Sequence, residues 1–407
     1  MIRIALISDI HFGKDARSKE YALPEQNING EIKNAVLLTE SAINVLKKQR
    51  IDYLFISGDL TSIGSPVEFY YCEKKINEIV EAVGISKEHV IWCTGNHDND
   101  WSIAKLGDDY KTENSDLQEV AKERYGSLAG AIADSNFGYK NIEKSNVLPS
   151  SGIYEDDNMI VFVLNSSSKC IRPEIIEHGS LTSEQLEWFK NKLDKYQEDT
   201  RWKIIMLHHH PFNYAFPSPS FDVSQLEEGS ELCDLAGKNG VNLVIHGHRH
   251  HPRCKTTIEN DWKNPVSFIC GGSFSVSEHY RNGGEIPNAF HILELSDEVG
   301  NLKMFSYEYC SSKGWKEVDK YRDEIPLDRV MYLGKVYKEE DTVEVLSNMV
   351  KDVHGMKIYE WNELDDSIKY KSSNVLERII GMVEEKESCE IKILPLDSII
   401  IRNKECI

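Results

Sequence analysis

The sequence lacks an apolar run long enough to span a bilayer, which takes about 20 residues, and it lacks a signal-type N-terminus. Its first ten residues, MIRIALISDI, contain little charge and no small-residue cleavage site. These absences argue against secretion and membrane insertion. The sequence therefore predicts a cytoplasmic protein with no membrane partner.

The sequence also lacks paired cysteines and an excess of basic residues. Its nine cysteines are scattered singly along 407 residues, which argues against a disulfide framework or a cysteine zinc site. We expect reduced, mostly buried thiols. The formal net charge of −20 opposes general nucleic-acid binding, because a protein that follows phosphates needs a basic face. A small anionic ligand can still bind where metal ions reverse the local charge.

Short apolar runs alternate with helical patterns in the first hundred residues. Apolar runs at Arg3–Ile7, Tyr53–Ile56 and Val90–Cys93 predict buried strands. Helical spacing predicts one helix over Glu31–Lys48 and a second that begins after Ser65, with a hydroxyl cap followed by proline. A strand–helix–strand order favours a parallel sheet and an α/β fold.

The rest of the chain is predicted to contain an insertion, further strands and a C-terminal tail. Residues 99–151 are mostly polar, with one helical pattern at 117–128, and we interpret them as an insertion over the site. Further strands are predicted at 159–164, 203–207, 243–245, 266–270, 289–295 and 302–309, with a helix capped by Thr182 before the second of these. The last two predict a hairpin. We predict a main domain over 1–331 and a small α+β extension over 332–407.

Five of the predicted strands end in residues that bind metals. In open α/β sheets, ligands bind beyond the carboxyl ends of the strands, so we expect these ends to meet. Oxygen and nitrogen ligands without thiolate suit manganese, iron or zinc. Two divalent ions about 3.5 to 4 Å apart would use all of these ligands. The residues are Asp9 and His11, Asp59, Asn96, His208 to His210, and His246 to His251.

The order of these motifs resembles that of the calcineurin-like metallophosphoesterase superfamily, over about residues 1 to 310. The resemblance implies a two-sheet β-sandwich flanked by helices. It also implies hydrolysis of a phosphate ester by a hydroxide that bridges two metal ions. The motifs are Asp9-Ile-His11, Gly58-Asp59, Gly95-Asn96-His97-Asp98, a histidine two places before Pro211, and Gly247-His248-Arg-His250.

The resemblance also assigns ligands to each ion. One ion would be bound by Asp9, His11 and His250, the other by Asn96, His209 and His248, and Asp59 would bridge them. We choose His209 among three adjacent histidines because it lies two residues before Pro211. His208 is then a core residue or a partner of a ligand, and His246 and His251 are hydrogen-bonded histidines at a strand end.

His97 resembles the catalytic histidine of the superfamily and is the candidate general acid, with Asp98 predicted to orient its ring and raise its pKa. The alternative for His97 is a substrate-positioning role without proton transfer. Ser62 stands where purple acid phosphatases have a tyrosine ligand, which argues against a ferric tyrosinate site. Candidates to line the substrate pocket are His210, Phe12, Phe212 and Tyr214, although packing under a loop is the better interpretation of the aromatic residues.

The substrate is predicted to be a small phosphate ester or nucleotide. The helix after Thr182 resembles the class III cyclic-nucleotide and glycerophosphodiester phosphodiesterase branch, so we favour a phosphodiesterase. Alternatives are a phosphomonoesterase that acts on proteins or small molecules and a nuclease of the double-strand-break repair type, which the acidic charge disfavours. A metal-free scaffold is a further alternative, but every ligand position is filled.

Overall fold

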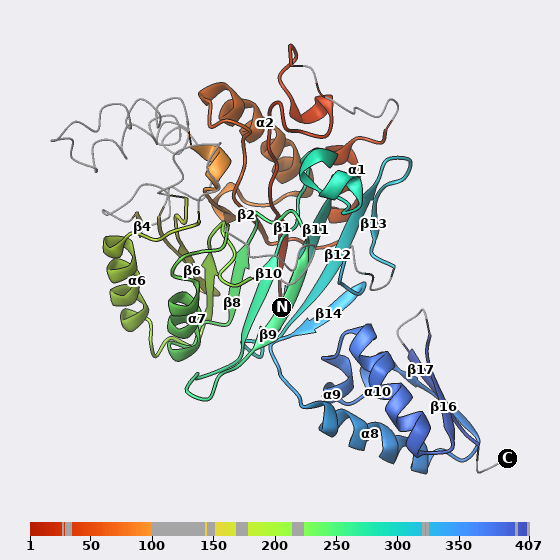
Figure 1. Ribbon diagram of the computed structural model, residues 1–407. Coiled ribbons are helices and arrows are strands. Elements are labelled where there is room, and N and C mark those ends of the chain that lie inside the picture. The colour runs from red at the N-terminus through yellow and green to blue at the C-terminus, as the bar shows by residue number, and fades with distance from the viewer. Residues whose placement is uncertain are drawn as a thin grey trace.

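The computed structural model describes residues 1–26, 28, 35–99, 143–144, 151–167, 178–213, 224–319, 322, 325–394 and 398–404. Three predictions lie outside these residues: the helix at 117–128, most of the insertion at 99–151, and the position of Tyr214. Two large sheets form the main part of the molecule, and a smaller sheet lies near the C-terminus (Figure 1).

The first large sheet contains the predicted N-terminal strands. β1 (Ile2–Ile7), β2 (Tyr53–Ser57) and β3 (Val90–Cys93) are parallel neighbours, which confirms the parallel start. β11 (Ala289–Leu295) pairs with β1 in the antiparallel sense and forms the predicted hairpin with β12 (Leu302–Cys310). Two strands absent from the prediction, β13 (Gly314–Glu317) and β14 (Val330–Leu333), both pair with β12.

The second large sheet has the order β4-β5-β6-β7-β8-β10-β9. Its centre is parallel and consists of four predicted strands: β6 (Met159–Val163), β7 (Trp202–Met206), β8 (Leu243–His246) and β10 (Val266–Cys270). The edges add strands that the sequence did not predict: β4 (Glu143–Lys144), β5 (Gly152–Glu155) and β9 (Arg253–Thr257).

Helices cover the outer faces of the two sheets (Figure 1). α1 (Leu38–Leu46) and α2 (Pro66–Val83) pack beside the first sheet, and α6 (Ser183–Lys195) and α7 (Gly229–Lys238) beside the second. α2 and α6 begin at the predicted caps. α1 begins later than predicted, because the Glu20 carboxylate accepts hydrogen bonds from the Leu38 and Thr39 backbone amides and so caps the helix there.

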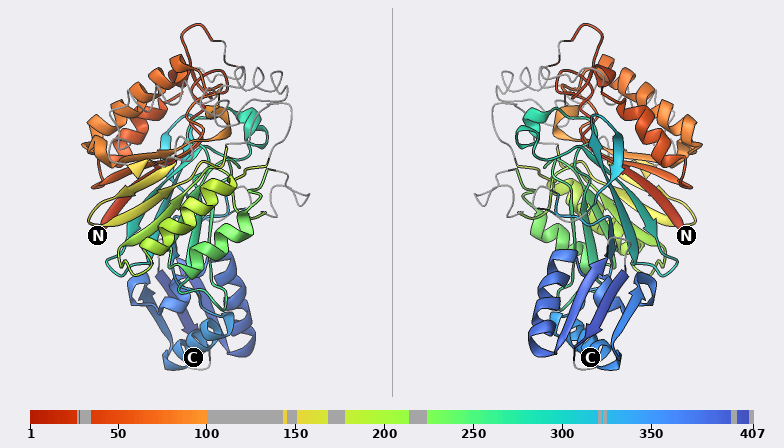
Figure 2. Two further views of the ribbon diagram at one scale, coloured as in Figure 1. Left: turned by 90° about the vertical axis from the view of Figure 1, so that its left-hand side faces the viewer. Right: turned by 90° about the vertical axis from the view of Figure 1, so that its right-hand side faces the viewer.

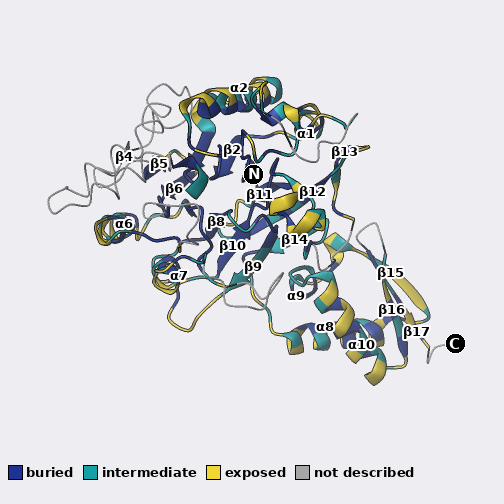
Figure 3. Ribbon diagram, turned by 45° about the horizontal axis from the view of Figure 1, so that its top comes forward, coloured by how far each residue is buried: buried dark blue, intermediate teal, exposed yellow. Residues whose placement is uncertain are grey.

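Two apolar cores follow from the alternation of side chains along the strands. In β7, Trp202, Ile204 and Met206 lie in the core that joins the two sheets. Ile205 lies with Leu207 in a second core beneath α6 and α7. Figure 3 shows buried ribbon through both sheets and exposed residues on the outer sides of the helices. The molecule is therefore the predicted α/β sandwich flanked by helices.

The C-terminal residues form a small α+β unit at the end of the sandwich away from α2 (Figure 2). Its strands β15 (Met356–Glu360), β16 (Cys389–Leu394) and β17 (Ser398–Asn403) pair in the order β15-β17-β16. α8 (Glu339–Asp352), α9 (Asp366–Lys369) and α10 (Ser373–Lys386) pack with these strands around a separate core. Only α10 and β16 were predicted here, and a domain division near residue 332 remains a proposal.

The seven cysteines among the described residues are free, and four of them are buried, as expected for reduced thiols. No helix in the described part of the chain combines the length and the apolar character that crossing a membrane requires.

Candidate metal centre

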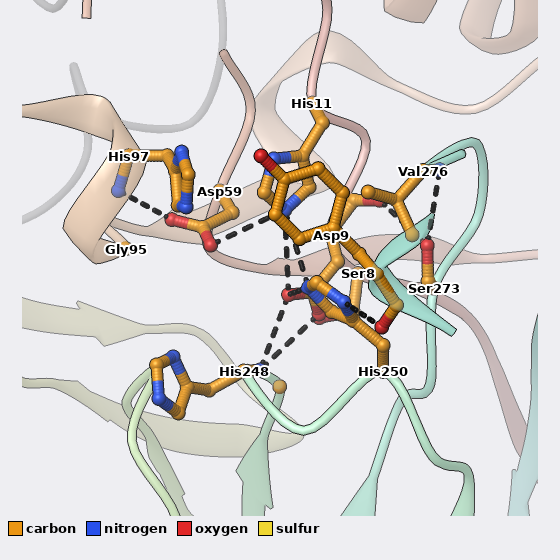
Figure 4. A network of polar contacts seen from close by, with 12 residues as sticks. Ser8, Asp9, His11, Asp59, Gly95, His97, His248, His250, Ser273 and Val276 are labelled. Atoms are coloured by element: carbon orange, nitrogen blue, oxygen red, sulfur yellow. Dashed lines mark hydrogen bonds and ion pairs between the residues drawn. The ribbon is translucent and has the colours of Figure 1, made fainter. Parts of the chain in front are cut away.

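The predicted strand ends converge where the two sheets meet (Figure 4). Three of them come from the first sheet and two from the second, so the site lies between the sheets. Their side chains are largely buried. Asp9 and His11 follow β1, Asp59 follows β2, Asn96 follows β3, His208 follows β7, and His248 and His250 follow β8.

A first group of ligand atoms comes from Asp9, His11, Asp59 and His250, all of which lie within 4.8 Å of one another. His250 Nε2 lies 3.0 Å from Asp9 Oδ1 and 3.2 Å from His11 Nε2. Two imidazole nitrogens at this distance repel each other unless a proton or a cation lies between them. The residues predicted for one ion are therefore together, and their geometry fits a divalent cation.

Asp59 lies between this group and the next. Its Oδ2 atom is 3.4 Å from His11 Nε2 and 3.1 Å from His208 Nε2. Its Oδ1 atom accepts a hydrogen bond of 2.8 Å from the His97 backbone amide, which fixes the carboxylate orientation. One carboxylate oxygen thus faces histidines of both groups, as a bridging ligand requires.

The second group consists of Asp59, His208 and His248. Asn96 adjoins it, with Oδ1 3.0 Å from His248 Nδ1. His209, the predicted ligand, lies beside His248 with the ring centroids 4.4 Å apart, but its Nδ1 contacts the Ser166 hydroxyl at 2.9 Å. The structure therefore brings His208, rather than His209, against Asp59.

The difference arises after β7, which ends at Met206. His208 and His209 are both fully buried, and their ring centroids are 5.3 Å apart. The His208 ring contacts Asp59, whereas the His209 ring lies against His248 and Ser166. Which of the two histidines coordinates an ion stays a prediction.

Several residues of the site have the same strained backbone conformation. Among the described residues, six that are not glycine have φ between 49° and 69°, a left-handed conformation that costs energy for residues with a side chain. Five of the six are predicted metal ligands, and the sixth is Asn282. Strain concentrated at the ligands indicates that their placement serves function. The five are Asp9, His11, Asp59, His248 and His250.

Two motif glycines allow the ligands to approach closely. A Cβ atom on Gly95 would lie 2.1 Å from Asp59 Oδ1, and one on Gly247 would lie 2.5 Å from Asp9 Oδ2. The His248 backbone amide, next to Gly247, donates to Asp9 Oδ1 at 3.2 Å. Any larger residue at these positions would push the carboxylates out of place.

Electrostatics in this buried centre are dominated by burial and by the carboxylates. Burial alone would raise the pKa of Asp59, but the neighbouring His208 and His97 hold it well below its usual range. Burial would lower the pKa of His208, yet the Asp59 carboxylate raises it to about 9. Burial and adjacent histidines lower the pKa of His248. Metal binding requires a neutral imidazole, so an ion bound between His208 and Asp59 would displace the proton that Asp59 stabilises on His208.

His97 lies beside the centre but is not oriented as predicted. Its ring centroid is 4.5 Å from that of His11, and its Nδ1 contacts the Ser62 carbonyl oxygen at 3.0 Å. Nδ1 donates its proton to this carbonyl. Nε2 is therefore the nitrogen that can exchange a proton with a substrate. Burial lowers the pKa of His97 to about 4, although the Asp59 charge opposes this effect.

Asp98 has a different role from the predicted one. Its Oδ1 accepts hydrogen bonds from the Thr61 amide and hydroxyl, and its Oδ2 accepts one from the Gly95 amide. Burial and the Asp59 charge raise the pKa of Asp98 to about 7. Asp98 therefore ties together the loops that follow β2 and β3, and the Ser62 carbonyl orients the His97 ring.

The candidate pocket-lining residues that the structure describes are packed against other side chains. Phe12 is 2% exposed and packs in the main core, 6.3 Å from the Tyr21 ring, which favours the packing interpretation given for the aromatic residues. Phe212 packs 5.0 Å from Phe268 with the Lys255 ammonium over its ring. His210 is fully buried, with its ring parallel to that of His248 at 6.0 Å.

Two other histidines and one missed residue complete the site. His246 contacts the Gly247 carbonyl and His251 contacts Arg253, as expected for histidines outside the ligand set. Tyr280, which the sequence analysis did not select, places its ring over His11. The pattern that could have found it is Gly271-Gly272 directly after β10, since this strand end lies beside the ligand-bearing ones.

The fold and this nitrogen and oxygen ligand set define a metal-dependent phosphoric ester hydrolase. Residues 2–252 match the family model for calcineurin-like phosphoesterase, and the chain belongs to that family. The Asp and His clusters suggest divalent metal ions as its cofactors.

Several known proteins are similar to the chain. A probable cyclic nucleotide phosphodiesterase of Synechococcus sp. is 24% identical over 250 residues, which cover 61% of this chain and 73% of that protein. Purple acid phosphatase PPD1 from yellow lupin is 15% identical with a TM-score of 0.47, and a dimetal phosphatase from Danio rerio is 11% identical with a TM-score of 0.42. The matches cover 75% and 78% of this chain and 51% and 98% of those structures, so the chain spans about half of the lupin protein.

Proposed function

We propose that this protein is a phosphodiesterase for small phosphate esters or nucleotides that uses two divalent ions. The observation that carries the proposal is Asp59, whose Oδ2 faces His11 on one side and His208 on the other. A carboxylate oxygen shared between two ligand groups is the arrangement that a two-metal site requires.

The proposed ligands of the first ion are Asp9, His11 and His250. Those of the second are His208, His248 and Asn96, with Asp59 shared. His208 replaces His209 in this proposal because of its 3.1 Å contact with Asp59. Manganese, iron and zinc suit these ligands. When bound, such ions lower the pKa of coordinated water and offset the charge of a phosphoryl group.

The protein residues supply orientation and proton transfer. The His97 amide fixes the Asp59 carboxylate, and the Ser62 carbonyl fixes the His97 ring. These two hydrogen bonds hold the proposed acid in a constant position relative to the bridging carboxylate. We assign proton transfer to the leaving oxygen, which becomes most basic as the ester bond breaks, to His97 Nε2. Because Nδ1 already donates to Ser62 and burial keeps the free ring neutral, Nε2 must first take up a proton, and the negative charge of a bound phosphoryl group favours that imidazolium.

The preference for a diester rests on the cyanobacterial relative, described as a probable cyclic nucleotide phosphodiesterase. The net charge of −20 disfavours long nucleic-acid substrates and favours small ones. Phosphomonoester hydrolysis is the second candidate, because the similar solved structures include phosphatases.

Hydrolysis of bis(4-nitrophenyl) phosphate and of 4-nitrophenyl phosphate by the purified protein tests the proposal, with metal content measured on the same sample. We expect two ions per chain and a higher kcat/KM for the diester. A faster monoester reaction selects the phosphatase, and bound metal without either reaction contradicts the hydrolase. A panel of cyclic nucleotides and single-stranded DNA then separates nucleotide substrates from a nuclease.

A further inference from the structure

The segment between β10 and β11 lies along the metal centre and is fastened to it. The Phe274 amide donates to the Ser8 carbonyl at 2.7 Å, and the Ser273 hydroxyl donates to the Asp9 carbonyl at 3.0 Å. The Ser277 amide donates to the Asp15 carbonyl at 2.9 Å. These bonds attach the segment to the loop that carries Asp9 and His11, so it forms a fixed wall of the site.

Tyr280 projects from this wall over the histidines. Its ring is nearly parallel to that of His11, with centroids 5.9 Å apart, and lies 6.3 Å from His97 and 6.0 Å from His250. Its carbonyl oxygen is 3.1 Å from His250 Nδ1, which leaves His250 Nε2 facing Asp9. Tyr280 thus holds a ligand through its backbone and covers the site with its side chain.

Arg281 fixes the position of Tyr280. Its guanidinium is 1% exposed and donates to the carbonyl oxygens of Val276 and Ile286, on either side of the turn. A buried guanidinium that joins two carbonyls restricts the backbone between them. The neighbouring tyrosine is therefore preorganised rather than free to swing away.

The ring of Tyr280 is available to a ligand, because the residue is 37% exposed. Burial and the nearby Asp15 carboxylate raise the pKa of its hydroxyl to about 12. A cavity of about 160 Å³ adjoins Tyr280 and Asp15, and the Asp15 carboxylate lies within 4.8 Å of a ring nitrogen of His97. A cavity of about 150 Å³ admits a benzene ring. Its other lining residues are Lys14, Arg17, Ser277, Glu278 and His279.

We propose that Tyr280 is a substrate-positioning residue whose ring stacks on a planar leaving group held in this cavity. The leaving group lies on this side because its oxygen must reach His97, and among the described residues Tyr280 places an aromatic ring 6.3 Å from that of His97. The inference rests on the proposed function and narrows its substrate class to phosphate esters whose leaving group carries an aromatic or heteroaromatic ring.

Calorimetric titration of the metal-loaded protein with phenylphosphonate and cyclohexylphosphonate tests this proposal without turnover. Both ligands carry the same phosphonate and six ring carbons, but only phenyl is flat. Aromatic stacking stabilises a complex by about 0.5–1.5 kcal/mol, so we expect phenylphosphonate to bind about two- to twelvefold more tightly. Equal affinities in the wild-type protein would overturn the proposal.

Three variants assign the preference to Tyr280. Tyr280→Leu should abolish the preference for phenyl, and Tyr280→Phe should keep it. Tyr70→Leu is the matched control, because Tyr70 is 55% exposed on α2, and it should bind like the wild type. Loss of the preference in Tyr280→Phe, or its persistence in Tyr280→Leu, would contradict ring stacking.

The same samples separate this inference from the proposed function. Metal content and hydrolysis of bis(4-nitrophenyl) phosphate by the wild-type protein report on the hydrolase itself. If both are present and the phenyl preference is absent, only the role of Tyr280 fails. If Tyr280→Leu does not fold, the wild-type ligand pair and Tyr280→Phe still decide the outcome.

Discussion

His208 Nε2 lies 3.1 Å from Asp59 Oδ2, whereas the adjacent His209 contacts the Ser166 hydroxyl through Nδ1. We predict that His208→Ala lowers the metal content toward one ion per chain, because it removes a ligand of the second ion. His209→Ala should retain both ions and serves as the matched control. Elemental analysis after dialysis measures this difference. Loss of an ion in His209→Ala but not in His208→Ala would instead support His209, which lies two residues before Pro211, as the ligand.

Asp59→Ala should remove metal and activity together. The shared oxygen of Asp59 faces both ligand groups, so neither ion keeps its full set of ligands without it. Asp297→Ala, at a carboxylate that is 88% exposed, is the control and should leave both unchanged. Two ions bound by the Asp59→Ala protein would refute the bridging assignment.

His97→Asn should lower kcat by roughly 10²- to 10⁴-fold while the metal content stays constant, because a general acid contributes about that much to a rate. The loss should be larger for an alkyl ester than for a 4-nitrophenyl ester, since 4-nitrophenolate needs little protonation. Steady-state kinetics with both substrates measure the difference. Equal losses would assign His97 to substrate positioning.

Glu68 should make the stability of the protein depend on pH. Its Oε2 accepts hydrogen bonds from the Ser62 and Ile63 amides, and burial raises its pKa from 4.5 to about 7. Between these values the folded state keeps a proton that the unfolded state has lost, so the contribution of Glu68 to stability is greatest below pH 4.5 and is lost as the pH rises through 7.

Denaturant unfolding of the wild-type protein and of Glu68→Gln at pH 5 and pH 8 tests this dependence. Glutamine can accept the same two hydrogen bonds and does not titrate. We expect the free energy of unfolding of the wild type to fall by up to about 3 kcal/mol relative to the variant over this range. If the free energy of unfolding changed by the same amount in both proteins between pH 5 and pH 8, a raised pKa for Glu68 would be excluded.

The sequence predicted the elements and motifs that depend on local order. The apolar runs of β1, β2 and β3 and the Ser65 cap of α2 were located from neighbouring residues alone. The start of α1 was not, because the capping carboxylate belongs to Glu20, which lies well before the helix in the chain. The burial of Phe12 depended in the same way on Tyr21 and Tyr71, which pack against it.

The sequence by itself determined which chemistry gathers at these strand ends, because aspartate, asparagine or histidine follows five of the apolar runs and no cysteine lies among those residues. Tertiary structure decided which of these side chains face one another. The contact between His208 and Asp59 joins the ends of β7 and β2, Asp98 joins loops from two strands, and Tyr280 lies on a segment fastened across the sheet edge. The direction of a side chain and its contacts depend on packing between distant segments, which the order of residues alone does not specify.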